Sequence, residues 1–449
     1  MDAHLQEEYK RKLVTADEAV RIVKSGDWIE YGFGLNAPKE LDEALSKRKD
    51  ELWNVNIRCD LGVWPKCTAD VDPTSRHFYW NSWHMSGLDR KYYNKGQLSY
   101  IPMKFNELPR MTRSNCVPPN VFVAMVTSMD RHGYFNFGTS ATNVWAAIEM
   151  AEYVIFEVNE NLPKVFGGNQ EAVHLSQVDF VVQGSNPKLP VLPPAQPADV
   201  DKKIAEHVIK RLYDGCCLQL GIGGVPNAVG SMIVDSDIKN LGVHSEMYVD
   251  AFVQMSKAGK ITGTKKQLDQ YKQVFSFALG SQELYDFINE NPGVASYSVD
   301  YTNNPEVIAQ LDNFVSINAC IEVDLFGQVS SESVGVRHIS GTGGQLDFVE
   351  GAYRSRGGQS FICMNSTFMN NGSLATRIRP TLEAGSIVTC PRTATHMVVT
   401  EFGIANMKGK STWERAEALI SIAHPQFHDE LIQEAEKMKI WRRSNRVAA

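Results

Sequence analysis

Two short segments in the second half of the chain contain the residue types that acyl-group chemistry needs. Residues 241–250 present the carboxylate of Glu246 in a short polar segment between apolar runs. Residues 221–226, which come just before, form a glycine-rich bend at the end of another apolar run. A carboxylate near exposed backbone N–H groups can accept an acyl group, because those donors stabilise the oxyanion that forms on attack. We therefore treat Glu246 as a candidate nucleophile and the bend as a candidate set of donors.

Each segment also has a simpler interpretation. The bend suits a tight turn between a strand and a helix that binds nothing, with Pro226 in the first helical turn. A dinucleotide-binding loop is a third option, because Glu246 follows Gly224 at about the spacing of a ribose-binding acid. The pattern Gly-x-Gly-Gly-x-Pro lacks the third glycine of such a loop, which argues against a nicotinamide-dependent dehydrogenase. A lone glutamate in a loop is most often merely solvated.

Two further segments are candidates for lining a ligand site. Residues 341–348 form a second glycine-rich bend, which either adds backbone donors to the site or is an ordinary turn before a helix over 347–354. Residues 78–87 place aromatic side chains around polar ones, an arrangement found in pocket walls and, more often, in cores. His84 is the polar member of interest. We expect no metal site, because Pro425 breaks the helix that would align His424 with His428.

The elements that must position these residues occur twice along the chain. In each half, a helix-like segment, a short strand and a glycine bend follow one another, over residues 15–38 and 200–226. One constant shift superimposes three pairs of glycines: Gly26 on Gly215, Gly32 on Gly221 and Gly34 on Gly223. Alternating helices and short buried strands predict two structurally related open α/β domains with mainly parallel sheets. Because ligands bind at the carboxyl ends of such strands, we expect one active site between the halves.

A proline-rich segment separates the two halves. Residues 187–197 contain five prolines, which neither continue a helix nor fit a central strand. We therefore predict an N-terminal domain over 1–182, a linker over 183–199, and a C-terminal domain with the nucleophile over 200–449. The apolar runs 153–158 and 397–402 are a second echo between the halves. Ser411 and Glu414 fit a capping box that opens a C-terminal helix.

The composition is that of a soluble globular protein with two domains. The 449 residues are 43% hydrophobic and 22% charged, and the net charge is −7. An acidic chain without a long basic run argues against nucleic-acid binding. We find no secretory signal and no apolar stretch long enough for a membrane span, so we expect none. The eight cysteines show no C-x-x-C spacing, which favours reduced thiols in a cytoplasmic protein.

Over nearly its whole length the chain resembles the class I coenzyme A-transferases of the acetyl-CoA hydrolase/transferase group. The resemblance rests on motifs in both halves, at residues 80–84, 133–138, 157–161, 219–228, 244–250, 343–348 and 440–445. It implies a fold of two related α/β domains, similar to the NagB-like fold, with the active site between them. It also implies the transfer of CoA from a short-chain acyl-CoA, such as butyryl-CoA, to a carboxylate such as acetate. CoA is then a substrate and product, and no permanently bound cofactor is expected.

The resemblance assigns roles to individual residues. It implies that Glu246 becomes a glutamyl-CoA thioester during a ping-pong reaction. We also place His84 and Asn36 in the pocket for the acyl group or carboxylate. CoA-binding and oxyanion roles fall on Gly221, Ile222, Gly223, Gly224, Val225, Ile321, Gly343 and Gly344.

One departure from the family pattern affects CoA binding. Relatives commonly carry a lysine that touches CoA in the turn over residues 366–372, and this chain has none there. Either Met369 to Asn371 replace it through backbone contacts, or another cation holds the CoA phosphates.

Several alternatives stay open at this point. Within the same class they are a 4-hydroxybutyrate CoA-transferase and an acyl-CoA hydrolase that uses the same glutamate. A non-catalytic acyl-CoA binder would need Glu246 to be dispensable. We expect a homo-oligomer, either a dimer or a tetramer.

Overall fold

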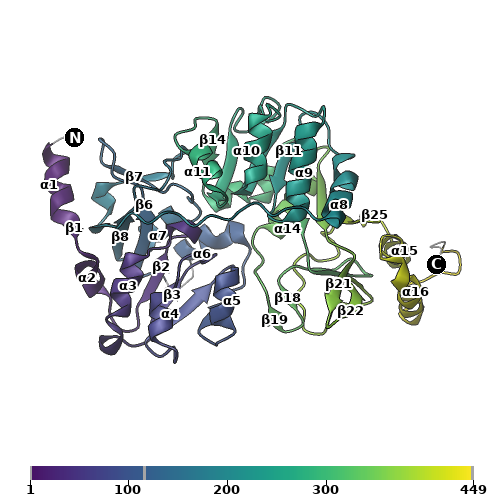
Figure 1. The fold of residues 1–449 in the computed structure, drawn as a ribbon, viewed down its shortest axis with the longest axis horizontal. Coiled ribbons are helices and arrows are strands. Elements are labelled where there is room, and N and C mark those ends of the chain that lie inside the picture. Colours follow the sequence, from purple (N-terminus) through teal and green to yellow (C-terminus); the bar gives the residue numbers. More distant parts are fainter. Residues whose placement is uncertain (1–2, 115–117, 446–449) are drawn as a thin grey trace. The chain divides into compact units, whose positions relative to one another are not determined.

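The computed structural model describes residues 3–114 and 118–445. Two eight-stranded sheets dominate it, each flanked by helices (Figure 1). Neighbouring strands of the first sheet all pair in parallel. Their order is β1 (Leu13–Val14), β10 (Phe180–Gln183), β8 (Tyr153–Val158), β6 (Val121–Val126), β2 (Trp28–Tyr31), β3 (Val55–Arg58), β4 (Phe78–Ser82) and β5 (Leu98–Tyr100).

The central strands of this sheet are apolar because both of their faces are covered. Strand β6 reads Val-Phe-Val-Ala-Met-Val and is buried at every position, as expected for a parallel strand between helical layers. The helices of this part are α1 (Ala3–Lys12), α2 (Ala16–Ala19), α3 (Glu40–Ser46), α4 (Cys67–Val71), α5 (Gly87–Tyr93), α6 (Leu108–Ser114) and α7 (Val144–Met150). A short antiparallel pair, β7 (Tyr134–Asn136) and β9 (Ala172–His174), accompanies the sheet.

The second sheet is parallel over most of its width. Pairing is parallel from β12 through β24, by way of β11, β15 and β20, and the edge strand β25 is antiparallel. Its order is β14 (Val294–Ser296), β13 (Gln273–Ala278), β12 (Gly242–Tyr248), β11 (Cys217–Leu220), β15 (Phe314–Ala319), β20 (Gln359–Cys363), β24 (Met397–Thr400) and β25 (Gly403–Asn406). The prediction of an α/β fold with mainly parallel sheets is confirmed.

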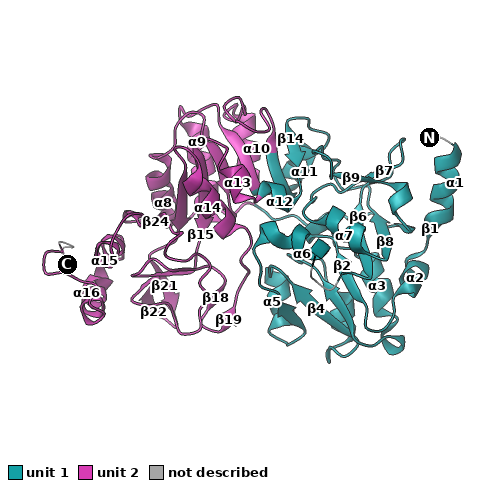
Figure 2. Cartoon of the chain, turned by 180° about the vertical axis from the view of Figure 1, so that it is seen from behind, with its two compact units in different colours: residues 1–193, 246–248, 274–302 teal, residues 194–245, 249–273, 303–449 magenta. Residues whose placement is uncertain are grey.

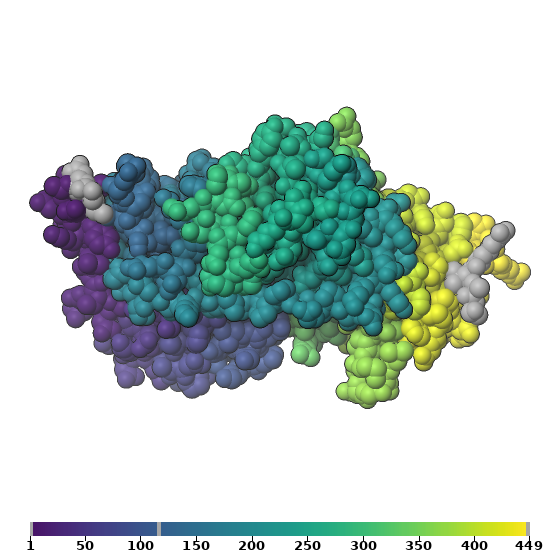
Figure 3. All heavy atoms as spheres, turned by 45° about the horizontal axis from the view of Figure 1, so that its top comes forward, coloured from purple at the N-terminus to yellow at the C-terminus, as the bar shows by residue number. Residues whose placement is uncertain are grey.

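The second half of the chain also contains nine helices among the described residues and several small sheets. The helices are α8 (Asp199–Ile209), α9 (Gly224–Asp235), α10 (Asp250–Lys257), α11 (Gln282–Ile288), α12 (Val299–Thr302), α13 (Pro305–Ile308), α14 (Gln345–Arg354), α15 (Thr412–Ser421) and α16 (His428–Lys437). The small sheets join β16 (Glu322–Asp324) to β17 (Val329–Ser330) and β23 (Ile378–Arg379), β18 (Ser333–Val334) to β19 (Arg337–His338), and β21 (Thr367–Asn370) to β22 (Ser373–Thr376). Residues of α15 and α16, yellow in Figure 3, form a continuous surface at the C-terminal end.

The two large sheets have the same strand order. From β2, the first sheet continues through β3, β4 and β5 on one side and through β6, β8 and β10 on the other. From β11, the second continues through β12, β13 and β14, and through β15, β20 and β24. The shift that superimposes Gly26 on Gly215 carries β2 onto β11 residue for residue. The duplication inferred from the glycines is therefore a duplication of sheet topology.

The second correspondence that we expected between the halves is wrong. It paired residues 153–158 with 397–402, which are β8 and β24, but the sheet order makes β20 the counterpart of β8 and β10 the counterpart of β24. Buried parallel strands all read as short apolar runs, so composition cannot tell one from another.

Local signals placed the helix starts better than the helix ends. The capping boxes of Thr15 with Glu18 and of Ser411 with Glu414 are both present. The helix-like segment expected at the start of residues 15–38, however, is α-helical only to Ala19 and continues as a 3-10 turn over Val20–Ile22. Residues 184–198, which include all five linker prolines, contain neither helix nor strand.

Two compact units make up the chain, and their limits differ from a simple cut at the linker. The first contains residues 1–193, 246–248 and 274–302, and the second contains 194–245, 249–273 and 303–449 (Figure 2). The segment 274–302 joins the first unit through several bonds. Among them, the N–H of Ala278 donates to the carbonyl of Thr139 and the Ser298 hydroxyl donates to the carbonyl of Thr142.

Candidate active site

The glycine bend of the second half connects β11 to helix α9. Gly223 has a φ of +121°, which side-chain-bearing residues avoid, and it caps the N-terminus of α9. A Cβ atom on Gly224 would lie 2.0 Å from a carboxylate oxygen of Asp201, so only glycine fits between α8 and α9 as they stand. Pro226 lies in the first turn of the helix, as predicted. The bend thus presents a helix N-terminus without bulky side chains, which an anionic group can approach.

Glu246 lies within strand β12, and the expectation of a polar loop is wrong. The residues on both sides of it are buried, and the glutamate itself is half-buried. Strand β12 pairs with β11, and the Ser245 hydroxyl donates to the carbonyl of Leu220 at 3.4 Å. His244 and Ser245 misled the prediction because polar residues in the middle of a buried strand look like loop residues in the sequence.

Three further candidate CoA contacts belong to the second unit. The N–H of Ile321 donates to the carbonyl of Ser330 at 2.8 Å, and its carbonyl accepts from Nη1 of Arg377 at 2.9 Å. Gly343 has a φ of +52°, and Gly344 is the N-terminal cap of α14. Gly344 therefore offers a second helix N-terminus, whereas the backbone groups of Ile321 already have partners.

The turn that departs from the family pattern is the tip of the hairpin β21–β22. Asn370 pairs with Ser373, so Asn371 and Gly372 form a two-residue loop with φ values of +48° and +84°. Asn-Gly is the preferred sequence for a hairpin turn with two positive φ values. Met369 is exposed next to this tip. The Asn-Gly pair is a hairpin signal that the sequence carries and that we did not use.

The predicted site residues fall in both compact units. Glu246, His84 and Asn36 belong to the first unit, with the segment 246–248. The second unit holds the glycine bend, Ile321 and the two glycines before α14.

A buried carboxylate, Asp60, is the residue that sequence reasoning missed. It follows β3 by two residues and is 3% exposed. Its Oδ1 accepts from the N–H of Trp83 at 2.6 Å, and its Oδ2 has no hydrogen-bond partner among the described residues. Burial, and next the charge of Glu30, hold the pKa of Asp60 well above its ordinary value. Glu30 in turn forms a buried ion pair with Arg58, at 2.6 Å.

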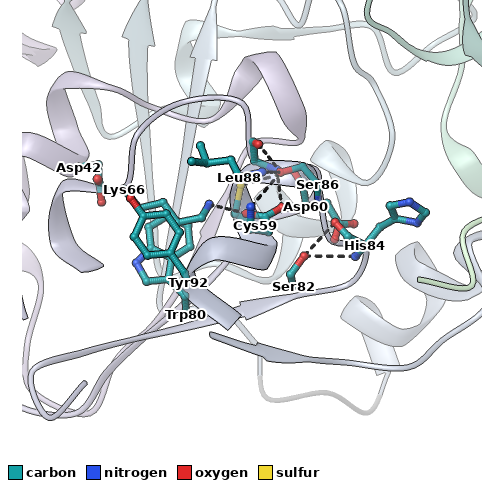
Figure 4. Close-up of polar contacts among 12 residues, drawn as sticks. Asp42, Cys59, Asp60, Lys66, Trp80, Ser82, His84, Ser86, Leu88 and Tyr92 are labelled. Atoms are coloured by element: carbon teal, nitrogen blue, oxygen red, sulfur yellow. Dashed lines mark hydrogen bonds and ion pairs between the residues drawn. The ribbon is translucent and has the colours of Figure 1, made fainter. Parts of the chain in front are cut away.

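The loops after β3 and β4 are clamped together around Asp60 (Figure 4). The N–H of Leu61 donates to the carbonyl of His84, and the Ser86 hydroxyl donates to the carbonyl of Gly62 at 2.6 Å. The His84 imidazole points away from this polar cluster in Figure 4 and is half-buried. The clamp therefore holds the backbone of His84 in place, and the ring lies on the side away from Asp60.

The side-chain amide of Asn36, in the first glycine bend, is hydrogen-bonded within the protein through both its nitrogen and its oxygen. Its Nδ2 donates to the carbonyls of Met125 at 2.9 Å and Phe137 at 2.6 Å, and its Oδ1 accepts from the Thr139 hydroxyl at 2.8 Å. Both amide hydrogens are used and the side chain is 1% exposed. A pocket role for Asn36 stays a prediction, and these bonds argue against it.

Other sequence expectations concern metals, membranes and thiols. Over residues 3–114 and 118–445 no group of three or more His, Cys, Asp or Glu side chains could hold a metal ion. In the same ranges no helix is long and apolar enough to cross a membrane. The seven cysteines in the described part are free thiols, and Cys116 lies outside it.

Comparison with known protein families and sequences gives matches over both halves. The acetyl-CoA hydrolase/transferase N-terminal domain matches residues 1–193, and the corresponding C-terminal domain matches residues 280–435. A probable butyrate:acetyl-CoA coenzyme A-transferase of Syntrophomonas wolfei is 65% identical over 443 residues, which cover 99% of both chains. A butyryl-CoA:acetate CoA-transferase of Anaerostipes caccae is 54% identical over 443 residues, or 98% of this chain and 99% of that one.

A solved structure agrees with these matches. RipA from Yersinia pestis superimposes with a TM-score of 0.89 at 34% identity, and the alignment covers 98% of this chain and 100% of RipA.

Proposed function

The chain belongs to the acetyl-CoA hydrolase/transferase family and is a CoA-transferase, and we propose that it moves CoA from butyryl-CoA to acetate through a thioester on Glu246. The observation that carries the choice of substrates is the 65% identity to the Syntrophomonas wolfei protein over 99% of both chains. CoA enters and leaves as part of a substrate, so the reaction needs no resident cofactor.

The proposed reaction is a double displacement. The Glu246 carboxylate attacks the thioester carbonyl, the C–S bond breaks, and an acyl-glutamyl anhydride and CoA thiolate result. The thiolate then attacks the glutamyl carbonyl, and cleavage of the C–O bond releases butyrate and leaves glutamyl-CoA. Acetate reverses both steps and departs as acetyl-CoA, which gives ping-pong kinetics. Each half-reaction as a whole exchanges one thioester for another, so little free energy is lost.

We propose that the glycine bend of residues 221–225 stabilises the oxyanions of these steps. Support comes from the start of α9, where Gly223 and Gly224 leave the first N–H groups of the helix unshielded. Strand β11 leads into the bend, and its pairing with β12, the strand that carries Glu246, joins Cys217 to Gly242 and Leu218 to Val243. One well-placed donor to an oxyanion contributes about 3 kcal/mol to catalysis.

The remaining assignments divide into CoA contacts and an acceptor pocket. We assign Gly343 and Gly344 to CoA, because Gly344 caps the N-terminus of α14. We assign His84 to the acyl or carboxylate pocket, because its backbone is clamped and its ring points away from the Asp60 cluster.

The test is a panel of carboxylate acceptors with butyryl-CoA as donor, in which free CoA and the new acyl-CoA are measured separately. We expect acetyl-CoA to form with acetate and little free CoA to appear. Faster turnover with 4-hydroxybutyrate would assign the protein to that activity instead. Stoichiometric release of free CoA would make it a hydrolase.

We propose further that the protein is a cytoplasmic homo-oligomer. The free thiols of the described residues fit a reducing compartment. Sedimentation velocity at several protein concentrations tests the oligomer, and a single monomeric species would contradict it.

A further inference from the structure

A guanidinium group in the second unit carries a positive charge without a carboxylate partner. Arg377 begins the segment that leads into β23, and its side chain is half-buried. Its Nη1 donates to the carbonyl of Ile321, and its guanidinium carbon lies 4.9 Å from the centre of the Phe368 ring. No carboxylate of the described residues lies within ion-pair distance of it. Burial lowers the pKa of Arg377 from its ordinary value, which shows that holding this charge costs free energy.

The nearby carboxylates form ion pairs and hydrogen bonds with other groups. Glu322 pairs through Oε2 with Nε of Arg379 at 3.3 Å, while its Oε1 accepts from the Ser386 hydroxyl at 2.8 Å and from the N–H of Glu383 at 3.2 Å. Glu383 itself lies 3.9 Å from Nη2 of Arg379. Arg379 therefore has two carboxylate partners, whereas Arg377 has none within ion-pair distance among the described residues and feels Glu322 only as a more distant charge.

The surroundings hold Arg377 in one orientation. Its N–H donates to the carbonyl of Ser366 at 2.8 Å and its carbonyl accepts from Val323 at 3.0 Å, which fixes the backbone on both sides. The Phe368 ring supports one face of the guanidinium, and the bond to Ile321 fixes one edge. Arginine has five N–H donors in a planar fork that matches phosphate oxygens. Such a group is ready to bind a phosphate with little loss of side-chain freedom.

We propose that Arg377 binds a phosphate group of CoA and supplies the positive charge that the turn at residues 366–372 lacks. This inference rests on the proposed function, because it takes CoA as the ligand, and on the CoA role that the family resemblance implies for Ile321. Both backbone groups of Ile321 are already hydrogen-bonded within the protein, one of them to Arg377. The contribution of this position to CoA binding is then made by the guanidinium that Ile321 holds, rather than by its own backbone.

The test compares Arg377→Gln and Arg377→Lys with the parent protein, with Arg356→Gln as the matched control. The Arg356 side chain is 85% exposed and pairs with Asp312. We expect Arg377→Gln to raise the Kd for CoA, by calorimetry, and the KM for butyryl-CoA about tenfold, which is the effect of losing about 1.4 kcal/mol. Arg377→Lys keeps the charge and recovers part of the loss. The KM for acetate and the kcat at saturating butyryl-CoA stay unchanged, and Arg356→Gln matches the parent throughout.

Truncated donors identify the phosphate. If the parent and Arg377→Gln have the same KM for butyryl-3′-dephospho-CoA, Arg377 binds the 3′-phosphate. A difference that persists there but disappears with butyryl-pantetheine would assign the pyrophosphate. A difference that persists with butyryl-pantetheine, or an unchanged Kd for CoA in Arg377→Gln, would overturn the proposal. Failure of the proposed function has another signature, because the parent protein itself would then not transfer CoA to acetate.

Discussion

The two large sheets share a strand order, and each has a carboxylate near the carboxyl end of one strand. The two carboxylates differ in burial. Asp60 follows β3 by two residues, and Glu246 lies within β12, the counterpart of β3 in the order of the second sheet. Asp60 is 3% exposed and accepts a hydrogen bond from Trp83, whereas Glu246 is half-buried. Each of these two corresponding strands therefore has an acid in it or just after it. One now holds loops together, and we propose that the other is the nucleophile.

The largest expected difference between the two acids is in catalysis. We expect Glu246→Ala and Glu246→Gln to lower kcat for transfer on the order of 10⁴-fold, because no other group can form the glutamyl intermediate. Asp60→Asn keeps an oxygen to accept from Trp83 and should still form the thioester on Glu246. Steady-state rates with butyryl-CoA and acetate measure this, and equal unfolding midpoints control for folding. Near-parental rates in Glu246→Gln would show that Glu246 is not the nucleophile.

Adding a methyl group to a glycine in either bend should lower the free energy of unfolding, but for a different reason in each bend. A Cβ on Gly32 would lie 2.4 Å from the backbone oxygen of Asn36, so Gly32→Ala must shift backbone and should cost about 1–3 kcal/mol in the free energy of unfolding. A Cβ on Gly224 meets the carboxylate end of Asp201, which can rotate away. Gly224→Ala should therefore cost less stability, and adding Asp201→Ala should recover it.

Urea unfolding of the three variants measures these costs. Equal losses for Gly32→Ala and Gly224→Ala, without recovery in the double variant, would show that the bends are equivalent in packing after all.

The smallest expected effect is a change in how stability depends on pH. The pKa of Asp60 is raised in the folded state, so the folded protein binds this proton more tightly than the unfolded chain does. The free energy of unfolding should therefore fall as the pH rises above the pKa of an unfolded aspartate, about 3.9. Asp60→Asn removes this titration. The free energy of unfolding of the variant should therefore rise relative to that of the parent between pH 5 and pH 8.

Asp89 is a suitable control for this effect. Lys66 and the hydrogen bonds that Asp89 accepts hold its pKa below the ordinary value despite burial. Asp89→Asn should therefore lose stability relative to the parent at pH 8 and lose less as the pH falls below 4. Denaturant unfolding at each pH tests both, and parallel pH curves for Asp60→Asn and the parent would contradict the raised pKa.

The sequence predicted the fold and the local turn chemistry well for physical reasons. Glycine positions reveal backbone geometry, so the shift that superimposes the glycines also matched β2 to β11. The same shift carries Asp60 onto Val249 and not onto Glu246, so the sequence does not align the two acids. The partners of Arg377 include Ile321, which is distant in the sequence, and pattern reasoning does not reach such contacts.

The most direct test of the account is to trap the intermediate. The protein is incubated with butyryl-CoA in the absence of acceptor, treated with hydroxylamine or borohydride, digested and mapped by mass spectrometry. The account predicts a hydroxamate or a reduced side chain at Glu246, absent from Glu246→Gln and unchanged in Asp60→Asn. A modification at Asp60 or at any other residue, with Glu246 unmodified, would contradict it.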